Sequence, residues 1–141
     1  MKANYNHILV FFISVFTFVS CADDPDPVLP EPTATGIEIG SGNSQQGFIG
    51  RDFHFDANVT AGERIADVII RILQKESETY AAPWQFEIVW TEFNGVRNAN
   101  IHKHFDIPDD APEGTYDFYF IVNDQNGTRL EIREDFRIIA P

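Results

Sequence analysis

Three histidines and two aspartates, spaced at alternate positions, are the residues of this chain best suited to chemistry. His102 and His104 are separated by one residue, as are His54 and Asp56, and Asp106 continues the first series. Successive side chains of a β-strand point to opposite faces, so each series would lie on one face of its strand. Imidazole nitrogens and carboxylate oxygens are ligands that Zn²⁺ and Cu²⁺ take from proteins.

These side chains form one site only if their strands are neighbours. Outward residues of paired antiparallel strands meet across about 5 Å. In a favourable register His54, His102 and His104 then converge, with Asp56 or Asp106 as a fourth ligand. The sequence therefore predicts a candidate zinc or copper site. The alternative is a set of separate polar side chains on a solvent-exposed sheet, where histidine is ordinary.

No catalytic constellation accompanies the histidines. If water completed the metal's coordination shell, metal-assisted hydrolysis would have its basic parts, but an open sheet face provides no dry, shaped cavity. The sequence contains no G-x-S-x-G, Walker, Rossmann or C-x-x-C motif. We therefore expect that the protein is not an enzyme.

Seven segments have the alternation or the β-branched composition of strands. Turn dipeptides such as Asn94-Gly95 and Asn126-Gly127 separate them. Residues 64–74 are also compatible with a helix, but their many Ile and Val residues favour a strand. The pattern predicts an all-β, immunoglobulin-like sandwich of about seven antiparallel strands, in which the second and fifth strands are neighbours. The predicted strands are residues 35–39, 48–60, 64–74, 84–93, 98–107, 115–123 and 129–138.

Aromatic residues agree with the sandwich and offer a second kind of site. Tyr116 follows Gly114 at the start of the sixth strand, where immunoglobulin-like folds place a tyrosine corner. Trp84 and Trp90 share one face of their strand, and we expect at least one of them in the core. If that face were exposed, the pair and Phe86 would form a stacking platform for sugar rings. Glycan binding is therefore a further hypothesis.

The first 21 residues have the features of a lipoprotein signal peptide. The apolar run from Ile8 to Val19 spans about 18 Å as a helix, which is too short for a hydrocarbon core of about 30 Å. The run ends in F-V-S-C, which resembles a lipobox. We expect removal of residues 1–20 and lipidation of Cys21, the sole cysteine, so an internal disulfide is excluded. The alternative is a non-lipidated signal peptide cleaved nearby.

Residues 21–34 are predicted to be a disordered, acidic, proline-rich tether that precedes a domain at 35–141. Its four prolines favour an extended polyproline II conformation. Acidic residues just behind the lipidated cysteine resemble the export signal of Bacteroidota-type lipoproteins. We expect an outer-membrane lipoprotein exposed at the cell surface, with the periplasm-facing side as the alternative. The net charge of −12 argues against nucleic acid as a partner.

The segment 101–118 resembles a family of small bacterial lipoproteins catalogued as domain of unknown function 4625. It reads I-H-K-H-F-D-I-P-D-D-A-P-E-G-T-Y-D-F, and the family pairs an HxH strand with an I-P-x-x-A-P-x-G-x-Y-x-F corner. F-H-F-D-A at 53–57 is similar to its early strand, so the resemblance covers most of residues 35–140. The resemblance implies an immunoglobulin-like fold and lipoprotein status but no activity. Family members often have more histidine in mid-chain, whereas residues 74–79 contain none.

The leading hypothesis is a membrane-anchored lipoprotein that carries a non-catalytic binding or interaction module. Its partner would be an unidentified protein or glycan. The alternatives are a lipoprotein that binds zinc or copper through the histidines and a module that binds glycans through the tryptophans.

Overall fold

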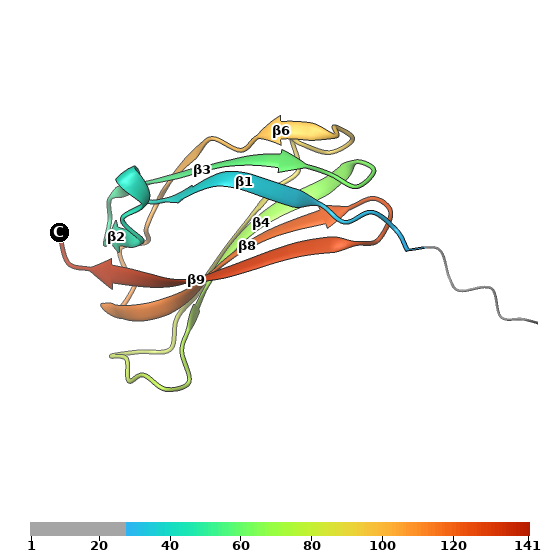
Figure 1. Cartoon of the computed structure of the whole chain (residues 1–141). Helices are drawn as coiled ribbons and strands as arrows, with labels where there is room; N and C mark the ends of the chain where they lie inside the picture. The colour runs from blue at the N-terminus through green and yellow to red at the C-terminus, as the bar shows by residue number, and fades with distance from the viewer. Residues whose placement is uncertain (1–27) are drawn as a thin grey trace, which may run out of the picture.

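The computed structural model describes residues 28–141, which form two β-sheets packed face to face (Figure 1). The smaller sheet contains β1 (Thr33–Ile39), β3 (Asp52–Thr60), β6 (Asn98–Asn100) and β7 (Lys103–Asp106). The larger sheet has the order β2 (Gln46–Phe48), β9 (Arg129–Ile139), β8 (Gly114–Asp124), β4 (Ile65–Gln74) and β5 (Gln85–Trp90). A short 3-10 helix, η1 (Ser41–Asn43), follows β1. The predicted all-β sandwich is confirmed.

Helical structure is almost absent from the described part of the chain. Residues 64–74, for which a helix was the alternative, form the strand β4. Across residues 28–141 no helix has the length and apolar character needed to cross a membrane.

The core lies between the two sheets and is built from alternate residues of each strand. In β3 the side chains of Phe53, Phe55, Ala57 and Val59 are buried, while the intervening residues face outward. The Phe55 ring packs against Phe120 of β8 at a centroid distance of 4.9 Å. This alternation places the aromatic residues inside and leaves His54 and Asp56 on the outer face of the smaller sheet.

Two of the predicted strands are each divided in the structure. Of the predicted strand 48–60, Phe48 is the last residue of β2 and residues 52–60 form β3; the two strands belong to different sheets, and β2 pairs in parallel with β9. The chain changes sheets through Gly50, whose φ of +66° suits glycine and whose added Cβ would lie 2.3 Å from the Asp109 carboxylate. Residues 98–107 become β6 and β7. Within residues 28–141 the sandwich therefore has nine strands, and one pair is parallel.

Tyr116 forms the predicted tyrosine corner. Its hydroxyl donates a hydrogen bond of 2.6 Å to the carbonyl oxygen of Pro112. The side chain is fully buried, and burial raises the pKa of the phenol to about 12. The hydroxyl therefore stays protonated and keeps donating at any ordinary pH.

We expect Tyr116→Phe to lower the free energy of unfolding by about 1–3 kcal/mol, because the Pro112 carbonyl loses its buried donor. Urea unfolding followed by tryptophan fluorescence measures the loss. Tyr119→Phe is the matched control, since Tyr119 is a partly buried tyrosine on the same strand. Equal losses in the two variants would mean that the corner hydrogen bond contributes nothing specific.

The N-terminal end of the described chain is held against two turns at one end of the sandwich. Asn126 Nδ2 and Thr128 Oγ1 donate to the Pro30 carbonyl oxygen at 2.8 Å and 3.0 Å. Gly62, in the β3–β4 turn, approaches so closely that a Cβ there would lie 1.9 Å from the same oxygen. The C-terminal part of the predicted disordered tether is therefore held against the domain at Pro30, and β1 starts at Thr33.

The predicted signal peptide, the lipidation of Cys21 and the first part of the tether fall within residues 1–27, outside the described residues.

Candidate metal centre

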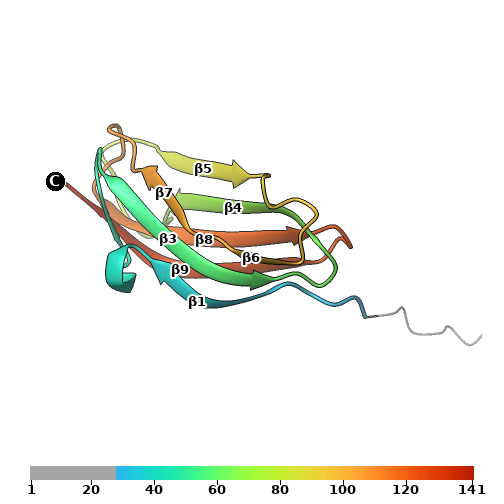
Figure 2. The ribbon, with the colours of Figure 1, turned by 90° about the horizontal axis from the view of Figure 1, so that it is seen from above.

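The strand pairing that the histidine site requires is present. β3 is the antiparallel neighbour of both β6 and β7, and His54 lies directly opposite His104. Figure 2 shows β3 between β1 and the β6–β7 segment. In the short gap between β6 and β7, Ile101 and Ala57 exchange backbone hydrogen bonds of 2.8 Å and 3.2 Å. This pairing keeps His102 beside β3 although it lies outside a regular strand.

The three imidazoles converge, as predicted. His54, His102 and His104 each offer one ring nitrogen, and these atoms lie within 4.8 Å of one another. Their ring centroids are 5.0, 5.1 and 5.4 Å apart. The side chain of His54 is 19% exposed, whereas those of His102 and His104 are 56% and 50% exposed. His54 is therefore the most buried residue of the cluster, whereas His102 and His104 face solvent.

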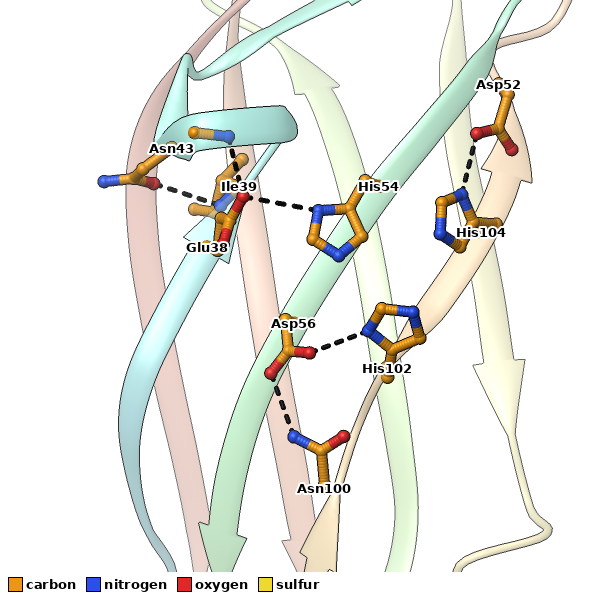
Figure 3. Close-up of polar contacts among 10 residues, drawn as sticks. Glu38, Ile39, Asn43, Asp52, His54, Asp56, Asn100, His102 and His104 are labelled. Carbon is orange, nitrogen blue, oxygen red and sulfur yellow. Dashed lines mark hydrogen bonds and ion pairs between the residues drawn. The ribbon is translucent and has the colours of Figure 1, made fainter.

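Each imidazole has a carboxylate at its Nδ1 atom. His102 Nδ1 lies 2.8 Å from Asp56 Oδ2, and His104 Nδ1 lies 2.7 Å from Asp52 Oδ2. His54 Nδ1 lies 3.5 Å from Glu38 Oε1. Figure 3 shows these carboxylates around the outside of the cluster, with the other ring nitrogens directed toward its centre.

The ionisation of Asp56 determines the tautomer of its partner. The hydrogen bond from His102 lowers the pKa of this carboxyl below 3.8, and it outweighs the opposing effect of desolvation; Asn100 adds a second hydrogen bond of 2.9 Å. An ionised carboxylate only accepts, so His102 Nδ1–H must donate and the lone pair of the neutral ring lies on Nε2. Metal-binding histidines in proteins commonly have this carboxylate–imidazole pairing.

The arrangement is close to a three-histidine metal site but more open. Tetrahedral nitrogens 2.0–2.1 Å from Zn²⁺ lie about 3.3 Å apart. Since the ring nitrogens lie within 4.8 Å of one another, no pair needs to close by more than about 1.5 Å. Exposed rings cover such distances by side-chain rotation alone. The two exposed imidazoles can therefore close on His54 without a change in the backbone.

The two aspartates predicted as fourth ligands do not join the cluster of ligand atoms, which comprises the three histidines. Asp56 instead orients His102 from outside. Asp106 lies opposite Asp52 at the end of β7. Sequence reasoning missed two carboxylates that contact the imidazoles, Asp52 and Glu38. Asp52 was detectable, since it precedes His54 by two residues on the same face, but Glu38 depends on the register between β1 and β3.

The predicted tryptophan platform does not form. Trp90 is buried, with 7% of its surface exposed, and belongs to the core. Trp84 and Phe86 are partly buried and pack against that core, and Trp84 contacts Tyr116 edge to face at 5.4 Å. This face of β5 points between the sheets, so the two tryptophans are not jointly available to a sugar ring.

A groove of about 470 Å³ borders the histidine cluster and includes His54 and His104 in its wall. The lining also includes residues of the segment that joins β1 to β2, and Phe48, which is 44% exposed. A molecule in this groove would reach two of the three imidazoles directly.

We expect the loss of either outer carboxylate, in Asp52→Ala or Asp56→Ala, to weaken zinc binding about 10–100-fold, because the imidazole loses its fixed orientation and part of its basicity. Competition titration with a zinc indicator measures the change. Asp106→Ala is the matched control, as it removes a carboxylate on the same face of the sheet that forms no hydrogen bond or ion pair with the three rings. A control loss as large as the others would indicate a general charge effect instead.

Together, the fold and the cluster define an immunoglobulin-like β-sandwich with a candidate metal centre on the outer face of its smaller sheet. The chain belongs to the family described as domain of unknown function (DUF4625), whose model matches residues 19–139. The resemblance seen in the HxH strand and the tyrosine corner is thereby confirmed.

Among solved structures, the chain is similar to the crystal structure of Spo0M, sporulation control protein, from Bacillus subtilis. The identity is 14%, the match covers 82% of this chain and 51% of the other, and the TM-score is 0.47. The chain thus spans about half the length of that protein. No curated protein matches this chain.

Proposed function

We propose that this protein is a membrane-anchored lipoprotein whose sandwich is a non-catalytic module that binds one Zn²⁺ or Cu²⁺ ion through His54, His102 and His104. The observation that carries the proposal is the orientation of the two nitrogens of each imidazole ring. One ring nitrogen is directed into the cluster and the other faces a carboxylate. Surface histidines that serve only solubility do not require three such partners.

Electrostatics also favour a cation at this position. Glu38, Asp52 and Asp56 place three carboxylates around the three imidazole rings. A divalent ion between the rings would reduce the mutual repulsion of these carboxylates. The site therefore gains from binding a metal in two ways, through the imidazole lone pairs and through the outer charges.

The position of the site suits display away from a membrane. His54 follows Asp52 at the start of β3, beyond the C-terminal end of β1, whereas the described N-terminus is held at the opposite end by Asn126 and Thr128 (Figure 1). A lipid on Cys21 would therefore leave the histidine cluster toward the far end of the sandwich. The lipobox and the acidic residues behind it favour an outer-membrane, surface-exposed location.

Metal analysis of the purified, untagged protein tests the proposal. After loading with zinc or copper and removal of excess ion by desalting, elemental analysis is expected to find one ion per chain. Isothermal titration with Zn²⁺ should give the same stoichiometry. A protein that retains no metal and shows no heat of binding would refute the proposed function.

A further inference from the structure

The three-histidine centre leaves one side of the metal open. Three protein nitrogens are one fewer than the four ligands of tetrahedral zinc, and sites with an open position bind water or an added ligand there. His102 and His104 are about half exposed, so the fourth direction points to solvent. Among the described residues, the cluster contains no further His, Cys, Asp or Glu ligand atom.

The groove beside the cluster borders two of the three proposed ligands. His54 and His104 belong to both the cluster and the groove wall. The lining also includes Ser41, Ser44, Asp52 and Phe48, which is 44% exposed. It thus offers polar and aromatic contacts to a group larger than water.

The charges around the site select against an anionic fourth ligand. Glu38, Asp52, Asp56 and Asp106 carry four negative charges, which exceed the two positive charges of the metal. The whole chain has a net charge of −12. A carboxylate or phosphate would therefore approach against a negative potential, whereas a neutral nitrogen donor would not.

We propose that a neutral imidazole, the side chain of a histidine in a partner polypeptide, completes the metal's coordination shell by way of this groove. The inference rests on the proposed function, because it requires the bound metal. Imidazole matches the preference of Zn²⁺ and Cu²⁺ for nitrogen. A second copy of this chain is not the donor, since its histidines in residues 28–141 are the three that hold its own metal.

Cobalt substitution tests the inference, because the visible absorption of Co²⁺ reports its ligands. The full chain in detergent is loaded with one equivalent of Co²⁺, and loading is checked by elemental analysis. The cobalt-loaded protein is then titrated separately with acetyl-Gly-His-Gly-amide, with acetyl-Gly-Ala-Gly-amide and with acetate. We expect a saturable spectral change with the histidine peptide, no change with the alanine peptide, and at least 10-fold weaker binding of acetate.

Failure of the inference is distinguishable from failure of the proposed function. If cobalt binds but the histidine peptide leaves its spectrum unchanged, or acetate binds as well as the peptide, the inference is wrong and the metal site stands. If no cobalt binds, both are wrong.

A groove variant tests the route to the metal. Phe48→Ala is expected to weaken the peptide about 3–10-fold while leaving cobalt affinity unchanged, since Phe48 is not a ligand. Val89→Ala is the matched control, because Val89 is equally exposed, at 45% against 44%, but lies on β5, at the opposite edge of the larger sheet from β2. Equal peptide affinity in both variants would overturn the assignment of the groove.

Discussion

The double variant His102→Ala/His104→Ala is expected to lose zinc binding by more than 100-fold. It removes two of the three ligands, and a single remaining imidazole is no better than free imidazole in solution. The loss should exceed the about 10–100-fold that removal of an outer carboxylate causes. Isothermal titration on untagged protein measures it, with wild type and variant at the same pH because metals compete with protons for imidazole.

The same variant is expected to keep its fold. Both side chains are about half exposed, and the buried residues beside them, Ile101 and Phe105, remain unchanged. Asn98→Ala is the matched control, since Asn98 is an exposed residue of β6 in the same sheet. Retention of zinc by the double variant, or its loss by the control, would show that the ion binds elsewhere or only through general charge.

Phe55→Ala is expected to lower the free energy of unfolding by about 3–5 kcal/mol, as large aromatic truncations in a core do. Phe55 is fully buried and packs against Phe120, Phe118 and Trp90 at centroid distances of 4.9, 6.0 and 6.3 Å. The described domain contains no cysteine, so packing must supply its stability. The total free energy of unfolding of such domains is about 5–15 kcal/mol, so the expected loss is a large share of it.

The measurement is urea unfolding with and without zinc. Phe55 points into the core and its neighbour His54 points out of the sheet, so the variant should keep the metal site while folded. A ligand at 100 times its dissociation constant adds about 2.7 kcal/mol to stability, and we expect a similar increment in wild type and variant. Val89→Ala, an exposed control, should cost less than about 1 kcal/mol. If the folded variant gained no stability from zinc, the packing of the core around Phe55 would be required for the metal site.

Local pattern was sufficient to predict most elements of the fold. The alternation through β3 and β8 identified which residues face the core, and β-branched residues identified β4. The pattern failed at Gly50 and at Ile101, because at each of these places the segment predicted as one strand is divided into two. At Gly50 the chain changes sheets, and an alternating pattern contains no information about which sheet a residue joins.

The candidate site was partly predictable for the same reason. The spacing of His102 and His104 placed them on one face, and the usual order of immunoglobulin-like strands placed His54 beside them. The role of Asp56 was misjudged, because whether a carboxylate reaches a metal or the far side of an imidazole depends on side-chain geometry. Glu38 lies 16 residues before His54 in the sequence, and the pairing of β1 with β3 brings it close.

The sequence by itself determined the all-β class, the inward and outward faces of its strands and the histidines that share a face, since each depends on the two-residue period of a strand. Tertiary structure alone decided the register that sets His54 opposite His104, the carboxylate behind each ring, the groove beside them and the burial of Trp90. These depend on how strands distant in sequence pack against one another, and such packing is a property of the whole sandwich.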